Sequence, residues 1–202
     1  MPEITFTNGV LTFEPFDCIC GRRHELPIQR IVARPGALEE LGAILEELEL
    51  GSNTVLVCDE NTWDAAGAEV EAMLRASDRN VTLCRFPTRE PVHPDETAIG
   101  SLMLAMDRST ELLVVAGSGC LTDLTHFVGS RTGVPFVSVA TAPSMDAYAS
   151  PGTPMTHGGY KRNIDATPAR AILADTDVLT TAPAEMVASG FGDTIGKLTS
   201  RI

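Results

Sequence analysis

Short apolar runs alternate with stretches of helical apolar spacing along most of this chain, and this alternation constrains its fold more than any other feature. One stretch has apolar residues at positions 38, 41, 44, 45 and 48, which is the period of an amphipathic helix. Apolar strands separated by such helices are typical of a parallel sheet covered on both faces. The runs that we predict to be strands cover residues 28–33, 54–58, 81–86, 112–116, 135–140 and 171–174.

We therefore predict an α/β fold, a Rossmann-like parallel sheet with flanking helices, divided into three consecutive parts. Residues 1–27 are expected to form an N-terminal extension or hairpin, and residues 28–180 the α/β domain. Within the α/β domain, the turn-rich segment 151–159 is compatible with a hairpin. Pro183 precedes another helical pattern, so residues 181–202 are expected to be the first helix of a truncated, all-helical domain.

The charge balance argues against nucleic acid as a partner. Lys and Arg number 15 against 27 Asp and Glu, which gives a formal net charge of −12. An acidic chain repels a phosphate backbone. A small nucleotide can still bind, because backbone N–H groups and a helix terminus hold phosphates locally.

Several features indicate a cytoplasmic protein that makes no membrane contact. No apolar run approaches the roughly 20 residues that span a bilayer, and residues 1–12 lack the pattern of a signal peptide. The five cysteines are odd in number and too sparse for a disulfide framework, so we expect reduced thiols. We also expect the chain to form a homo-oligomer.

Three residues of types that ligate metals lie close together near the N-terminus, at Cys18, Cys20 and His24. They could hold zinc, which usually takes four protein ligands in a structural site. No fourth candidate lies nearby in the sequence. The alternative, which we favour, is a small hairpin with exposed thiols.

A glycine-containing segment follows the apolar run 112–116 and precedes a helical pattern. Glycines at such a strand-to-helix turn let the backbone approach a pyrophosphate, and the helix N-terminus supplies N–H donors. The alternative is a tight turn that binds nothing, because short glycine motifs often match by chance. The residues concerned are Gly117, Ser118, Gly119, Cys120 and Leu121.

Asp59 ends the predicted strand 54–58, where a carboxylate can accept hydrogen bonds from an adenosine ribose and would repel a 2′-phosphate. Taken alone, it is more simply interpreted as a solvated acid that caps the next helix. Parallel strands end at one edge of a sheet, so we expect Asp59, Gly117 and Thr141 to lie together.

Two later segments carry acids in unusual surroundings. Asp146 lies in the run 141–151, which is rich in small hydroxyl residues; the acid suits a polyol hydroxyl, and a polar loop packed on the sheet edge is the alternative. Asp193 lies among three glycines of a predicted helix, where each glycine costs about 1 kcal/mol relative to alanine. Such glycines favour close packing or close ligand approach. A lone Asp, however, makes a weak metal site.

These segments, in this order, resemble the glycerol-1-phosphate dehydrogenases of the dehydroquinate synthase-like and iron-containing alcohol dehydrogenase superfamily. The resemblance covers the chain from about Cys18 to its end and is strongest over four segments. They are residues 117–124 (GSGCLTDL), 141–146 (TAPSMD), 150–152 (SPG) and 190–193 (GFGD).

The resemblance implies reduction of dihydroxyacetone phosphate to sn-glycerol 1-phosphate with NAD or NADP as cofactor and a divalent metal, zinc or nickel. Asp59 would hold the ribose, residues 117–121 the pyrophosphate, and Asp146 the substrate. Asp193 would be a metal ligand close to the substrate, and Lys161 receives no role. The remaining cofactor contacts that the resemblance implies are Thr141, Ala142, Pro143, Ser144 and Ser150.

One departure from that family is serious. The resemblance implies two further metal ligands from histidines downstream of Asp193, whereas the four histidines here all precede it and match no ligand position. We therefore expect an incomplete metal site and a chain that is inactive alone. A glycerol dehydrogenase-like enzyme, a non-catalytic nucleotide-binding module and a phosphosugar-binding regulator remain alternatives. The histidines are His24, His93, His126 and His157.

Overall fold

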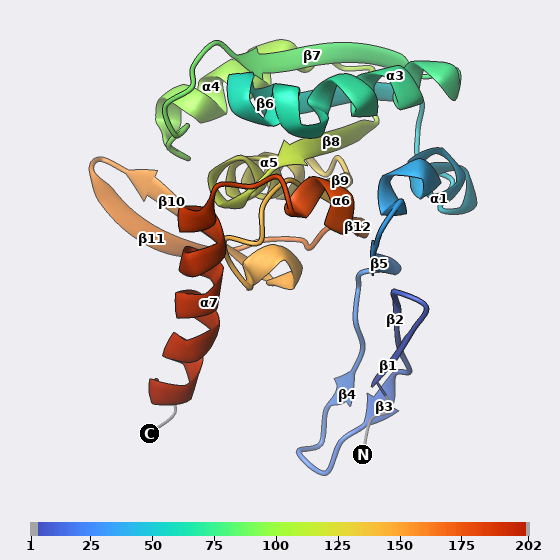
Figure 1. The fold of residues 1–202 in the computed structure, drawn as a ribbon, viewed down its shortest axis with the longest axis vertical. Coiled ribbons are helices and arrows are strands. Elements are labelled where there is room, and N and C mark those ends of the chain that lie inside the picture. The colour runs from blue at the N-terminus through green and yellow to red at the C-terminus, as the bar shows by residue number, and fades with distance from the viewer. Residues whose placement is uncertain (1–3, 201–202) are drawn as a thin grey trace.

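The computed structural model describes residues 4–200 and has an eight-stranded sheet at its centre (Figure 1). The strand order is β1-β2-β5-β12-β9-β8-β6-β7, and the last six of these are mutually parallel. The predicted parallel sheet is therefore confirmed. The parallel strands are β5 (Arg30–Arg34), β12 (Ala171–Asp175), β9 (Phe136–Ala140), β8 (Leu112–Gly117), β6 (Asn53–Asp59) and β7 (Asn80–Phe86).

Alternate residues of the central strands pack against helices on opposite faces of the sheet. Leu56 and Val114 join one core cluster, together with apolar residues of α1 and α3. Val57 and Val115 join the second cluster, with residues of α4 and α5. This explains the continuous apolar runs, since both faces of a central strand are buried. The helical segments are η1 (Ala37–Glu40), α1 (Leu41–Glu47), α2 (Glu60–Thr62), the π-helical η2 (Trp63–Gly67), α3 (Ala68–Ala76), α4 (Glu96–Ala105) and α5 (Gly119–Thr132).

The N-terminal segment forms two hairpins, and one of them extends the main sheet. Strands β1 (Ile4–Thr7) and β2 (Val10–Phe13) pair antiparallel, and β2 pairs antiparallel with β5. Strands β3 (Phe16–Asp17) and β4 (Arg23–His24) make a separate small hairpin. The division at residue 27 stays a prediction, although backbone hydrogen bonds cross it.

The segment between β9 and α7 contains the hairpin that its turn residues predict. After the short η3 (Ala147–Ala149), β10 (Gly152–His157) pairs with β11 (Tyr160–Asp165). Strand β12 then leads into α6 (Thr176–Leu179), which Asp175 caps by accepting from the N–H of Asp177 at 2.9 Å.

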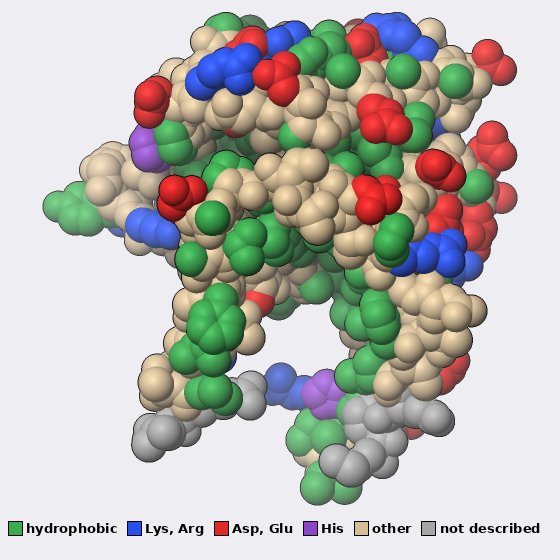
Figure 2. Space-filling view, viewed as in Figure 1, with side chains coloured by type: hydrophobic (Ala, Val, Ile, Leu, Met, Phe, Trp, Pro, Cys, Tyr) green, Lys and Arg blue, Asp and Glu red, His purple; other side chains and the backbone are tan. Residues whose placement is uncertain are grey.

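Helix α7 (Ala184–Thr199) projects away from the sheet (Figure 1). Gly190 is its one buried residue. Apolar side chains along the helix are exposed, and they form green patches on it in the space-filling view (Figure 2). Among residues 4–200, none of the helices combines the length and apolar character needed to cross a bilayer.

Candidate nucleotide-binding site

A pocket lies where three neighbouring parallel strands end. Strands β9, β8 and β6 are adjacent in the sheet, and the N–H of Thr141 donates to the carbonyl of Gly117 at 3.1 Å. The cavity has a volume of about 480 Å³. The predicted meeting of Asp59, Thr141 and the glycine turn at one sheet edge is confirmed. The lining residues are Asp59, Asn61, Thr62, Ala65, Arg89, Pro91, Val92, Ser118, Cys120, Leu121, Thr141, Ala142, Thr181, Ala182, Pro183 and Met186.

The N-terminus of α5 opens into this pocket. Ser118 is the N-cap residue, yet its side chain makes no capping hydrogen bond. The first intrahelical bond runs from the N–H of Thr122 to the carbonyl of Ser118 at 3.0 Å. The N–H groups of the preceding first turn have no intrahelical acceptor and carry the positive end of the helix dipole. This donor set suits a phosphate or pyrophosphate.

The two glycines of this turn serve different purposes. A Cβ on Gly117 would lie 2.8 Å from the Cβ of Leu121, which is too close, so Gly117 is needed for the tight strand-to-helix turn. A Cβ on Gly119 would meet only the Sδ of Met145, at the ordinary distance of 3.4 Å. Packing therefore explains Gly117 but not Gly119, and an approaching ligand remains a reason for the second glycine.

Asp59 caps the helix that follows it, as the simpler interpretation predicts. Its Oδ1 accepts from the N–H of Thr62 at 2.8 Å, while the Oγ1 of Thr62 accepts from the N–H of Asp59 at 2.9 Å. The side chain is not solvated, because the residue is only 8% exposed. Asp59 also lines the pocket, so its capping role does not remove it from the candidate site.

Loops supply pocket residues that the sequence did not reveal. Arg89 donates to Asp64 Oδ2 at 2.8 Å and to Asn61 Oδ1 at 3.2 Å, which fixes a cation at the pocket. Thr181 enters from the α6–α7 connection, and Met186 from the first turn of α7. The only sequence signal for Arg89 was its place in a loop beside a strand end.

The segment after β9 is divided between the pocket and α7. Thr141 and Ala142 line the pocket, whereas Pro143, Ser144 and Ser150 are not among its lining residues. A Cβ on Gly190 would lie 1.9 Å from the carbonyl oxygen of Pro143, so α7 packs directly on this loop. The Oγ of Ser150 accepts from the N–H of Gly152 at 3.1 Å.

Asp146 and Asp193 lie together, joined through the backbone. The N–H of Asp146 donates to Asp193 Oδ2 at 3.0 Å and thereby lowers the pKa of Asp193. Lys197 Nζ donates to Asp146 Oδ1 at 3.0 Å, and this bond raises the pKa of Lys197. The sequence offers no cation near Asp146, but the fold supplies one from 51 residues away. Asp146 therefore has a structural partner as well as a place near Asp193.

A further carboxyl group, that of Asp123, lies on α5. Burial raises its pKa to about 6, although Thr153 Oγ1 donates to it at 3.1 Å and Lys161 lies near enough to oppose the shift. This titration near neutral pH is not visible in the sequence.

The histidines do not complete a metal site around Asp193. His126 is buried against Phe136, with ring centroids 5.2 Å apart, and burial lowers its pKa. The Nε2 atom of His157 lies 3.8 Å from Oε1 of Glu96. Within residues 4–200, no group of three or more His, Cys, Asp or Glu side chains close enough to share a metal includes Asp193. The residues described here therefore do not fit a complete metal centre at that position.

A parallel α/β sheet with a pocket at its strand ends and a glycine turn leading into a helix belongs to the class of α/β folds that bind ligands at this edge of the sheet. Residues 32–183 match the protein family described as iron-containing alcohol dehydrogenase. The chain belongs to that family.

Among curated relatives, a glycerol-1-phosphate dehydrogenase [NAD(P)+] of Bacillus velezensis is 36% identical over 187 residues, covering 92% of this chain and 47% of that protein. The enzyme of the same name from Thermofilum pendens is 36% identical over 181 residues, covering 88% and 49%. The chain thus spans about half the length of these relatives.

Solved structures show the same fold. A probable glycerol dehydrogenase from Sinorhizobium meliloti superposes with a TM-score of 0.68 at 22% identity, over 83% of this chain and 45% of that one. An iron-containing alcohol dehydrogenase gives a TM-score of 0.73 at 15% identity, over 84% and 51%. At these identities the likeness supports the α/β architecture alone.

Proposed function

We propose that this chain forms the nucleotide-binding part of an NAD(P)-dependent enzyme that reduces dihydroxyacetone phosphate to sn-glycerol 1-phosphate. The observation that carries the proposal is the 480 Å³ pocket at the ends of β6, β8 and β9, into which α5 points its N-terminus. The curated relatives named glycerol-1-phosphate dehydrogenase support the choice of reaction.

The residues at the pocket fit a dinucleotide. Its volume lies within the roughly 300–1,000 Å³ of small-molecule sites. The first turn of α5 would hold the pyrophosphate through residues 117–121, and Asp59 would accept from the ribose hydroxyls. Thr141 and Ala142 would flank the cofactor, whereas Pro143, Ser144 and Ser150 would reach it only from the neighbouring loop. The bound cofactor supplies the hydride.

The substrate side rests on Asp146 and Asp193. We propose that Asp146 accepts a hydrogen bond from a substrate hydroxyl, and that Asp193 is one ligand of a divalent metal. The family description supports a metal in general terms, and zinc or nickel is our narrower proposal. Because the described residues around Asp193 do not complete a metal centre, we assign no step of the reaction to a metal.

Two further proposals concern the setting of the protein. The five cysteines are free, which supports a reducing, cytoplasmic compartment. The homo-oligomer expected from the sequence stays a prediction.

NADH fluorescence titration tests the cofactor site. Gly119→Val and Asp59→Ala should each weaken binding at least about 10-fold, which is about 1.4 kcal/mol. Gly100→Val is the control for Gly119→Val. Gly100 lies in a helix, as Gly119 does, and a Cβ on Gly100 would meet no atom within 4 Å. Asp95→Ala is the control for the second, since Asp95 caps α4 as Asp59 caps α2. Equal affinity in the test and control variants would refute the site.

A non-catalytic nucleotide-binding module is the second candidate, because no three-ligand group in residues 4–200 includes Asp193. An assay with dihydroxyacetone phosphate, NADH, and added zinc or nickel separates the two. We expect this chain to bind NADH without turnover. Turnover like that of a full-length relative would refute both our expectation of an incomplete metal site and the proposal of a non-catalytic module.

A further inference from the structure

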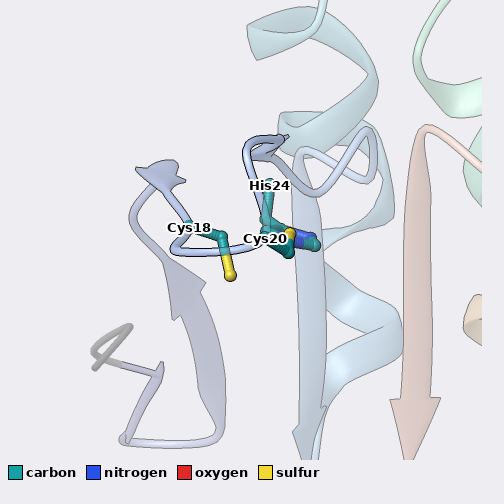
Figure 3. Close-up of side chains that lie close together, drawn as sticks. All are labelled: Cys18, Cys20 and His24. Atoms are coloured by element: carbon teal, nitrogen blue, oxygen red, sulfur yellow. The ribbon is translucent and has the colours of Figure 1, made fainter.

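The β3–β4 hairpin brings three soft or borderline metal ligands together. In the sequence, these residues are far from the residues that line the pocket. The Sγ atoms of Cys18 and Cys20 and a ring nitrogen of His24 all lie within 4.8 Å of one another (Figure 3). Among residues 4–200, this is the one group of three or more His, Cys, Asp or Glu side chains with that spacing.

The backbone of the hairpin explains why these residues meet. The N–H of Cys18 donates to the carbonyl of Arg22 at 2.9 Å, and the N–H of Gly21 donates to the carbonyl of Cys18 at 2.9 Å. Gly21 has a φ of +81°, in the left-handed region that favours glycine. The turn is thereby closed back on itself, and Cys20 Sγ comes to lie 3.3 Å from His24 Nε2.

The imidazole of His24 is oriented before any metal arrives. Phe16 is its cross-strand partner, and the two rings stack with centroids 5.1 Å apart and planes 20° from parallel. Such stacking holds the ring beside Cys20 and reduces the loss of side-chain freedom on binding.

The spacing is close to what zinc requires. Zn–S bonds of about 2.3 Å and Zn–N bonds of about 2.0 Å place tetrahedral ligand atoms about 3.5–3.8 Å apart. Ligand atoms within 4.8 Å of one another need to close by no more than about 1.0–1.3 Å to reach these separations. Thiolate and imidazole ligands together favour zinc over the hard cations magnesium and calcium.

Apart from the ring contacts of Phe16 and an exposed ion pair between Arg23 and Asp17, little else stabilises the hairpin. Residues 14–27 contain no buried residue, and β3 and β4 share only two residue pairs. A two-stranded hairpin of this kind is marginal in water without a further constraint, and a bound metal would supply one.

We propose that Cys18, Cys20 and His24 form a zinc site with three protein ligands and a fourth position open to solvent. Cys20 and His24 are both exposed, so water can take that position. The site fixes the β3–β4 hairpin. This proposal departs from our sequence-based preference for exposed thiols without a metal, and it does not depend on the proposed dehydrogenase activity.

Cobalt titration of the reduced full chain tests the proposal. One equivalent of Co²⁺ should give thiolate-to-cobalt charge-transfer absorption and the intense visible bands of tetrahedral cobalt, and Zn²⁺ should displace it. Cys18→Ser, Cys20→Ser and His24→Gln should each weaken binding at least about 100-fold, more than the loss of an outer-shell partner does. His157→Gln and Cys84→Ala are the controls, because neither residue belongs to the β3–β4 hairpin or to the pocket, and both should bind cobalt as the wild type does.

Trypsin provides a second readout, since it cleaves after Arg22 and Arg23 within the hairpin. Zinc should slow this cleavage in the wild type and in His157→Gln, but not in His24→Gln. Because residues 14–27 are not buried, the variants should keep the wild-type circular dichroism spectrum. Cobalt bands without thiolate character, bands unchanged in all three ligand variants, or bands lost in either control would each overturn the site.

Discussion

Helices α5 and α7 are similar in length but are held in opposite ways. Seven of the 14 residues of α5 are buried between the sheet and α4, whereas α7 buries only Gly190 among its 16 residues. Both helices have apolar residues at helical spacing in the sequence. An amphipathic pattern therefore indicates that a helix has an apolar face, but not what that face contacts. Most of the stability of a helix in a protein comes from such contacts.

Helix α7 is attached at a few points between its middle and its last turn. Gly190 packs against the carbonyl of Pro143, Asp193 accepts from the N–H of Asp146, and Lys197 binds the Asp146 side chain. Its apolar face stays exposed in this structure at Val187, Phe191, Ile195 and Leu198. These contacts position the helix beside the 141–150 loop and bury little apolar surface.

Hydrogen exchange should give the largest contrast between the two helices. Amides around Leu124 in α5 should exchange only on global unfolding, because well-packed elements open with nearly the full unfolding free energy. Amides around Ile195 in α7 should exchange at least about 10³-fold faster, given total stabilities of about 5–15 kcal/mol. Mass-spectrometric exchange on a monomeric sample measures both. Equal protection of the two helices in a monomer would show that α7 is packed as firmly as α5.

Truncating a leucine on each helix should give the next largest contrast. Leu124 is fully buried, so Leu124→Ala should lower the free energy of unfolding by about 2–5 kcal/mol. Leu198 is 67% exposed, so Leu198→Ala should change it by less than about 0.5 kcal/mol. Urea unfolding of the two variants beside the wild type is the measurement. A cost above about 2 kcal/mol for Leu198→Ala would show that α7 has a packing partner in solution.

The two helices also carry acids whose pKa values shift in opposite directions. Burial raises the pKa of Asp123 on α5 to about 6, so its contribution to folding is complete below its unfolded pKa, about 3.9. That contribution is lost as the pH rises through about 6. Asp193 on α7 has a lowered pKa. Its contribution is present above the unfolded pKa and is lost as the pH falls through the lowered folded value.

Asp123→Asn should isolate the first of these effects. Between about pH 4 and pH 7, the wild type should lose on the order of 2 kcal/mol of stability relative to the variant, which cannot ionise. Asp193→Asn should leave the pH dependence of stability in this range unchanged. The pKa of Asp193 in the unfolded chain lies at the lower end of the range, and its lowered pKa in the folded chain lies below it. Parallel stability profiles for the wild type and Asp123→Asn would contradict the raised pKa.

The sequence predicted which segments form strands and helices better than it predicted which of these segments pack or pair with one another. All six apolar runs became parallel strands, because a continuous apolar run between turns suits a strand buried on both faces. The addition of β2 to the edge of β5 was not predicted. That pairing depends on which strand edge remains free after the sheet forms, and this is a property of the whole topology.

In the candidate site, too, the sequence predicted the residues at the strand ends but not those that come from loops. The meeting of Asp59, Gly117 and Thr141 could be predicted, since carboxyl ends of parallel strands share one edge. Arg89 and Thr181 could not, because their places depend on loop paths that no periodic pattern specifies. The contact between Asp146 and Lys197 depends on the angle at which α7 leaves the α6–α7 connection.

The smallest expected effect concerns that last contact. Lys197 is 59% exposed and Asp146 is 35% exposed at the side chain, and exposed ion pairs contribute about 0–1 kcal/mol. Lys197→Gln, Asp146→Asn and the double variant should therefore give a coupling free energy below about 1 kcal/mol that shrinks with added salt.

Asp146→Asn keeps the backbone N–H that donates to Asp193, so its melting temperature should fall by no more than about 2–4 °C. In an active full-length relative carrying the equivalent change, activity should be lost if the acid binds substrate. A larger stability loss in Asp146→Asn would mean that its main role is to hold α7, and the proposed substrate contact would then lose its support.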